Sequence, residues 1–68
     1  MFEAEVKSYR CFLVNSADHF DGYEVFEAET EADVRAYARR LLTRKLKAVA
    51  VEIWQGGTIV GRVDRESS

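Results

Sequence analysis

The sequence predicts an α+β domain of order ββαββ, in which one helix packs on one face of a four-stranded, mainly antiparallel sheet. Three observations favour this fold. Four short runs are rich in β-branched and aromatic residues, one central segment has apolar residues at helical spacing, and the glycines fall between the runs. The 68 residues allow one domain over 1–68, with an ordered core of about 5–64 and a short C-terminal tail from Arg65.

Residues 6–14 and 23–28 are predicted to form the first two strands. Both alternating sets of residues 6–14 are largely apolar, which indicates a central strand covered on both faces. Residues 15–22 read as a loop that ends in the turn-forming pair Asp21-Gly22. Glu24 and Glu27 in the second run are typical of a strand at the sheet edge.

A helix is predicted from Thr30 to about Arg44. Thr30 is a good N-cap, and Asp33 three residues later resembles the second half of a capping box. The apolar positions follow the i, i+3, i+4, i+7, i+8 spacing of a one-sided helix. They are Val34, Tyr37, Ala38, Leu41 and Leu42.

Residues 48–54 and 59–64 are predicted to pair as a second hairpin around Gly56-Gly57. Two adjacent glycines suit a type I′ turn, which would pair Trp54 with Ile59 and Ile53 with Val60. One face would then carry Val49, Val51, Ile53 and Val60, and the other Ala50, Trp54, Ile59 and Val63.

Both faces of this hairpin are apolar, yet one helix can cover only one face of the sheet. A chain this short also buries little surface alone, and with one cysteine it has no disulfide to add stability. We therefore predict a non-enzymatic binding module that forms a homodimer, with an unidentified protein partner as a further option. The predicted interface consists of Trp54, Ile59, Val63 and Ala50.

Short patterns along the chain resemble a family of small bacterial proteins of unknown function, mostly from proteobacteria. The matching stretches are residues 9–13, the pair Asp21-Gly22, residues 36–42 (A-Y-A-R-R-L-L) and residues 51–56 (V-E-I-W-Q-G). The chain departs from the family pattern at His19-Phe20, which lengthen the loop, and at residues 44–47, where a glycine-containing turn is more usual. The resemblance implies the ββαββ fold and a bacterial origin, and it implies no activity.

Catalytic and metal chemistry find little support in the residues. Cys11 lies within an apolar strand, so we expect a buried thiol and not a nucleophile activated by His19. The spacing of Asp18, His19 and Asp21 matches neither a calcium loop nor a zinc site. We expect no cofactor, because Gly56-Gly57 lacks the remainder of a phosphate-binding loop.

The same features bear on location. A single cysteine favours a reducing compartment, so the cytoplasm is the expected location. No apolar run reaches the length of about 18 residues that a membrane-spanning helix requires, so we expect no membrane association.

Charge is segregated along the chain. Residues 18–33 hold seven acids and no base, whereas residues 35–47 hold six bases and no acid. The runner-up function is therefore nucleic-acid binding, although the net charge of −2 disfavours it. Alternatively, the acidic hairpin of one subunit meets the basic helix of another. The basic residues proposed for nucleic acid are Arg35, Arg39, Arg40, Arg44 and Lys47.

Overall fold

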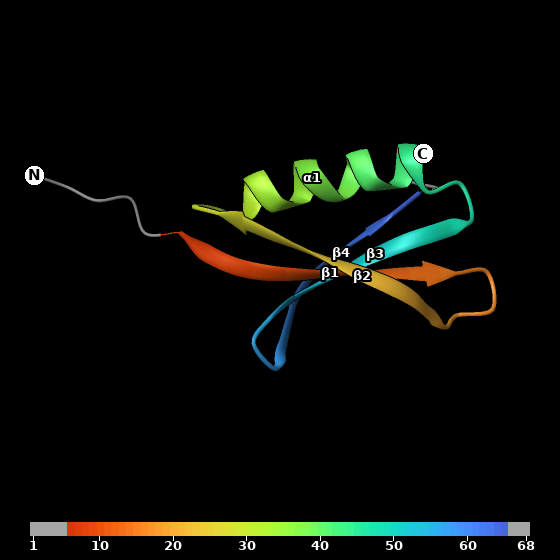
Figure 1. Ribbon diagram of the computed structural model, residues 1–68, viewed down its shortest axis with the longest axis horizontal. Coiled ribbons are helices and arrows are strands. Elements are labelled where there is room, and N and C mark those ends of the chain that lie inside the picture. The colour runs from red at the N-terminus through yellow and green to blue at the C-terminus, as the bar shows by residue number, and fades with distance from the viewer. Residues whose placement is uncertain (1–5, 66–68) are drawn as a thin grey trace, which may run out of the picture.

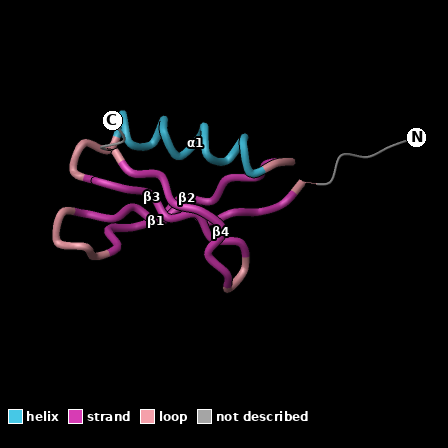
Figure 2. Tube along the Cα trace, turned by 180° about the vertical axis from the view of Figure 1, so that it is seen from behind, coloured by secondary structure: helices cyan, strands magenta, loops and turns pink. Residues whose placement is uncertain are grey.

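The computed structural model describes residues 6–65 of the chain, and there it contains four strands and one helix. These are β1 (Lys7–Asn15), β2 (Phe20–Ala28), α1 (Glu31–Arg44), β3 (Ala48–Gln55) and β4 (Thr58–Asp64). The strands form one sheet of order β2-β1-β3-β4 in which all neighbours are antiparallel. The helix lies along one side of this sheet (Figures 1 and 2). The ββαββ prediction is confirmed.

The first hairpin has the predicted places in the sheet, with β1 in the interior and β2 at the edge. Its loop is shorter than predicted, because β2 begins at Phe20 and the pair Asp21-Gly22 lies within the strand. The Asn15 side chain tightens the turn by accepting hydrogen bonds from the backbone N–H groups of Ala17 and His19, at 2.9 and 3.0 Å. An Asx-type turn therefore replaces the predicted Asp-Gly turn.

The helix begins and ends where its sequence predicts. Thr30 is the N-cap, and its hydroxyl accepts a hydrogen bond from the Asp33 backbone N–H at 3.2 Å. Tyr37, on the flank of the apolar stripe, stacks on Phe26 of β2 with ring centroids 4.1 Å apart. Its hydroxyl donates to the Glu24 carboxylate at 2.7 Å, which ties α1 to the β2 edge.

One hydrophobic core lies between α1 and the sheet. Its largest fully buried members include Tyr9 of β1, Ile53 of β3 and Leu41 of α1. Alternation along β1 sends Tyr9, Cys11 and Leu13 into this core, and the opposite residues turn away from the helix. The core also includes Ala28, Val34, Ala38, Leu42, Ala48, Val51 and Val63.

A β-bulge in the second hairpin corrects one predicted face. Trp54 pairs with Ile59 as predicted, but the register then shifts by one residue, so that Ile53 pairs with Gly61 and not with Val60. Val63 consequently faces the helix and is 8% exposed in the core. Its predicted place on the same face as Trp54 and Ile59 was wrong, since an extra residue in one strand inverts every later side chain.

The turn of this hairpin also differs from the prediction. Only Gly56 has a positive φ, of 63°, whereas a type I′ turn requires positive φ at both central residues. Positive φ at the first central residue alone is the pattern of a type II′ turn.

Val49, predicted on the face of Val51 and Ile53, is instead 39% exposed beside a register shift between β1 and β3.

Arg65, which the sequence places in the tail, is firmly held. Its backbone N–H donates to the Val49 carbonyl at 2.9 Å, and its guanidinium donates to the carbonyls of Lys45 and Ala48. The rest of the predicted tail lies outside the described residues. Within residues 6–65 no helix is long and apolar enough to cross a membrane.

Candidate interaction surface

The face of the sheet turned away from α1, which we call the open face, is built by strand alternation and cross-strand pairing. Register places Phe12 of β1 opposite Tyr23 of β2 and Glu52 of β3. Val14 likewise pairs with both Phe20 and Ala50. Because paired residues share a face, these side chains lie together on the side opposite the helix. The open face comprises Arg10, Phe12, Val14, Phe20, Tyr23, Val25, Ala50, Glu52, Trp54, Ile59, Arg62 and Asp64.

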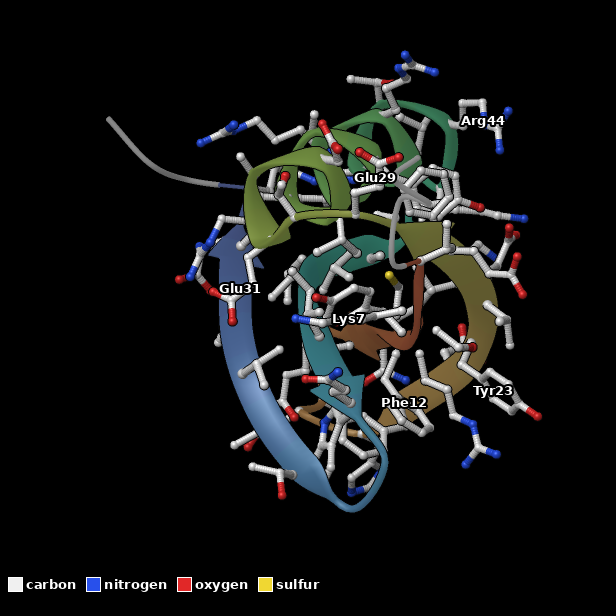
Figure 3. All side chains as sticks on the ribbon, turned by 90° about the vertical axis from the view of Figure 1, so that its left-hand side faces the viewer. Lys7, Phe12, Tyr23, Glu29, Glu31 and Arg44 are labelled. Carbon is white, nitrogen blue, oxygen red and sulfur yellow. The ribbon has the colours of Figure 1, made fainter. Side chains whose placement is uncertain are left out.

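Phe12 is the centre of an aromatic cluster on the open face. Its ring stacks on Phe20 with centroids 4.8 Å apart, and the Tyr23 and Trp54 rings lie at 5.2 and 6.1 Å. The Arg10 guanidinium lies over the Tyr23 ring at 5.6 Å, within cation–π distance. Figure 3 shows Phe12 and Tyr23 on the side of the sheet away from the helix. Three strands therefore supply one continuous aromatic surface.

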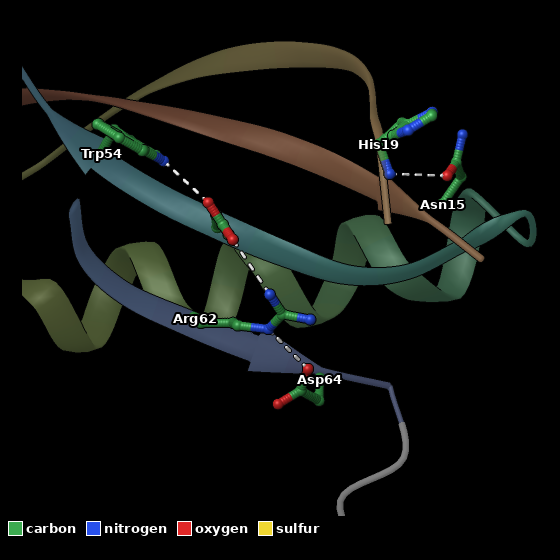
Figure 4. A network of polar contacts seen from close by, with 6 residues as sticks. Asn15, His19, Trp54, Arg62 and Asp64 are labelled. Carbon is green, nitrogen blue, oxygen red and sulfur yellow. Dashed lines mark hydrogen bonds and ion pairs between the residues drawn. The ribbon is translucent and has the colours of Figure 1, made fainter. Parts of the chain in front are cut away.

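A polar network borders this cluster on the β3–β4 side. The Glu52 carboxylate accepts hydrogen bonds from the Trp54 indole N–H at 3.2 Å and from the Arg62 guanidinium at 3.1 Å. Arg62 also donates to Asp64 at 2.9 Å (Figure 4). The network fixes the orientation of the indole and pairs the charges beside it, so the surface has an apolar middle and a polar border.

Much of the apolar area on the open face is exposed. Phe20, Tyr23 and Val25 are 51%, 52% and 53% exposed, and Ile59 at the opposite edge is 47% exposed. A contiguous exposed apolar patch of this kind on a protein surface commonly marks an interaction site. The open face is therefore the candidate site of this chain.

Of the four predicted interface residues, the open face brings together three, Trp54, Ile59 and Ala50. Ala50 is fully buried and leaves no surface for a partner. Sequence reasoning missed Phe12, Phe20 and Tyr23, which contribute most of the aromatic cluster. The alternation of Tyr23 and Val25 against Glu24 and Phe26 was the available signal, but Phe20 had been assigned to a loop.

The predicted basic patch is divided between two sides of the helix. Arg35 and Arg39 line a groove between α1 and β4. Arg40 lines a separate groove beside β2, and Lys47 lies near the loop that follows the helix. Lys45 at the helix end pairs with Glu24 of β2 at 3.8 Å. Arg44 lies near Tyr37. The hydrogen bond to Glu24 has the largest effect on the pKa of the Tyr37 phenol and raises it, and the charge of Arg44 lowers this pKa by a smaller amount.

The residues considered for catalysis and metal binding do not form a site. Cys11 is fully buried in the core, and burial, aided by the charge of Glu24, raises the pKa of its thiol to about 11. His19 is exposed in the β1–β2 turn. Across residues 6–65 no group of three or more His, Cys, Asp or Glu side chains is arranged to hold a metal ion.

Comparison with family models, with characterised proteins and with solved structures finds no match to this chain. The resemblance drawn from residues 36–42 and 51–56 therefore stays a prediction.

Proposed function

We propose that the chain is a non-enzymatic binding module and that its first partner is a second copy of itself, joined through the open face. The observation that carries this proposal is the aromatic cluster around Phe12, whose Phe20 and Tyr23 rings are half exposed. Aromatic side chains with an apolar body dominate the energetics of protein interfaces.

The composition of the open face fits a protein interface. A typical interface has an apolar core and a polar border whose charges are paired. Phe12, Tyr23 and Trp54 supply such a core, and the Glu52–Arg62 pair supplies the border. Glu52 beside Trp54 is already paired with Arg62, whereas Arg10, the cross-strand neighbour of Trp54, lies over the Tyr23 ring and makes no ion pair within residues 6–65. Covering this surface therefore leaves Arg10 as the charge that needs a partner.

The small size of the chain also supports a homodimer. The helix and the sheet bury one core cluster, on the helix side of the sheet. A domain of about this length usually needs a further source of stability, and a second copy would bury the open face without any new element. Face-to-face packing of two sheets is a common way to do so.

The absence of enzymatic activity and the cytoplasmic location belong to the same proposal. The thiol of Cys11 is the most nucleophilic type of side chain present, and it is buried with a raised pKa, so it is held as the unreactive thiol. A buried free thiol is suited to a reducing compartment such as the cytoplasm.

Sedimentation equilibrium at high salt, where attraction between charged surfaces is screened, tests the homodimer. Under this condition we expect the wild-type chain to behave as a dimer, and Ile59→Glu to shift it to a monomer because the new charge would be desolvated in the apolar interface. Leu46→Glu is the matched control, since Leu46 is 79% exposed and lies outside the open face. A wild-type monomer at all concentrations, or a dimer that survives Ile59→Glu, would contradict the proposal.

Nucleic-acid binding is the second candidate, supported by the groove in which Arg35 and Arg39 lie together with Arg62 and Arg65. The acids of β2 and the net charge of −2 weigh against it. Titration with single-stranded and duplex DNA at several salt concentrations separates the two functions. Binding that falls steeply with salt and is lost in Arg35→Glu would favour this candidate.

A further inference from the structure

The sheet has two free edges, β2 and β4, that run in opposite directions. β1 is antiparallel to both β2 and β3, and β3 is antiparallel to β4, so β4 runs with β1 and against β2. A second copy placed beside the first in the same orientation would therefore present its β2 antiparallel to the first copy's β4. Such an addition continues the sheet and keeps both helices on the same side.

The β4 edge carries a basic groove between the strand and α1. Four arginines line it, with Asp64 as the carboxylate among its lining residues, and Asp64 is already paired with Arg62. Arg35 and Arg39 make no ion pair with any residue in the described part of the chain. The four arginines are Arg35, Arg39, Arg62 and Arg65.

Gly61 allows the basic groove to form. A Cβ atom at this position would come within 2.8 Å of the Arg35 guanidinium, so the guanidinium lies directly over the backbone of β4. Arg35 thus places its charge beside the free edge of the strand and not out in solvent. This contact also fixes the height of the charge along β4.

The β2 edge carries a matching acidic groove on the other side of the helix. Glu27, Glu29 and Asp33 line it, with Arg40 as its single cation. None of the three acids forms an ion pair within residues 6–65. They lie where β2 ends and α1 begins, at the same end of the helix as Arg35.

From these observations we propose that a second copy of the chain adds through its β2 edge to the β4 edge of the first, with its acidic groove against the basic groove. The charges select this pairing. Two β2 edges would bring like acids together and two β4 edges like bases, whereas the mixed junction brings opposite charges together. The registers across the sheet place Glu24 of β2 level with Gly61 of β4, so a shift of two residues along the strands brings Glu27 of the added copy beside Arg35.

This junction differs from the proposed homodimer in both surface and symmetry. It uses the strand edges and shares only Arg62 and Asp64 with the open face. It joins two different surfaces of the chain, so it repeats from copy to copy until it closes into a ring or continues as a fibre. Both contacts can exist together, and each can be removed without the other.

The test uses two charge-reversed variants, both in the Ile59→Glu background so that the open face does not contribute. The first, Arg35→Glu with Arg39→Glu, reverses the basic groove. The second, Glu27→Arg with Glu29→Arg, reverses the acidic groove. Sedimentation velocity at low salt follows their assembly, and circular dichroism checks that each variant is folded.

We expect the Ile59→Glu chain to form species larger than a dimer as concentration rises, and added salt to dissociate them. Each reversed variant alone should self-associate at least about tenfold more weakly. Mixed in equal amounts, the two variants should assemble together again, because both the native junction and the doubly reversed junction bring opposite charges together. Arg44→Glu with Lys47→Glu, an equal charge change outside both grooves, should leave assembly intact.

Three results would overturn the proposal. They are a chain with Ile59→Glu that stays monomeric at high concentration and low salt, assembly that survives in either reversed variant, and a mixture of the two reversed variants that does not assemble. The homodimer proposal is judged separately by comparing the wild-type chain with Ile59→Glu at high salt.

Discussion

Gly56 and Gly57 are adjacent in the β3–β4 turn, yet only the first needs to be glycine. Gly56 has φ of 63°, a conformation that costs other residues about 1–2 kcal/mol. Gly57 does not have positive φ, and a Cβ added there would meet no atom within 4 Å. We expect Gly56→Ala to lower the free energy of unfolding by about 1 kcal/mol or more.

Gly57→Ala is the matched control for this turn. We expect a change within about 0.5 kcal/mol, or a small gain from the reduced freedom of the unfolded chain. Chemical denaturation of both variants provides the comparison. Equal losses from the two substitutions would show that the turn has positive φ at both glycines, as a type I′ turn requires.

Cys11 and Tyr37 make stability depend on pH in the alkaline range. Burial raises the pKa of Cys11 from 9.0 to about 11, and the hydrogen bond to Glu24 raises that of Tyr37 above 10.0. Folding therefore favours the protonated forms, and their contribution is complete below pH 9. We expect the free energy of unfolding to fall as pH rises from 9 through 11, by about 1.4 kcal/mol for each unit of pKa difference.

Cys11→Ala separates the two groups. It should lower the free energy of unfolding at neutral pH by creating a cavity. Between pH 9 and 11, however, the free energy of unfolding should fall less steeply than in the wild-type chain. Denaturant midpoints measured over this range test both effects. An unchanged decline in Cys11→Ala would show that the thiol is not the group responsible.

At the scale of elements, the helix is the part of the fold that local sequence specifies most completely. Its cap, its apolar stripe and its end at Arg44 all agree with prediction, because each depends on residues within a few positions of one another. We expect Thr30→Ala to cost about 1 kcal/mol, since the Asp33 N–H loses its partner.

Thr30→Ser keeps the hydroxyl and is the control for the cap. It should retain most of the stability that Thr30→Ala loses in a thermal or chemical melt. Equal losses in the two variants would assign the effect to the threonine methyl group and not to the cap.

The strands were predicted less completely than the helix. Their number, order in the chain and approximate bounds follow from composition and turn residues. The bulge that places Val63 in the core and the start of β2 at Phe20 depend on pairing across strands, which periodicity along one strand does not encode. For that reason Val63 was assigned to the wrong face and Phe20 was assigned to a loop.

At the scale of the whole molecule, the sequence predicted that one sheet face would lack a helix, but not what that face contains. The apolar residues of β3 and β4 were the basis of that prediction. The aromatic cluster instead centres on β1 and β2, with Phe12 between Phe20 and Tyr23. Strand order brings these residues beside Trp54, and strand order is a property of the folded chain alone.

Segregation of charge has a similar origin at this scale. Acids of the first block lie along β2 and the start of the helix, whereas only part of the basic block, Arg35 and Arg39, lies beside β4. The sequence showed the blocks as one acidic and one basic run. The fold divides the basic run, so that Arg35 and Arg39 face β4 while Arg40 faces β2.

The most direct test of the central claim is an isotope-filtered NOE experiment on a mixture of labelled and unlabelled chains, which detects only contacts between copies. If two copies meet through the open face, the ring protons of Phe20, Tyr23 and Trp54 will show NOEs to the other chain. Leu46, exposed outside this face, will show none. A dimer whose intermolecular NOEs avoid these rings, or no intermolecular NOEs at millimolar concentration, would contradict the account.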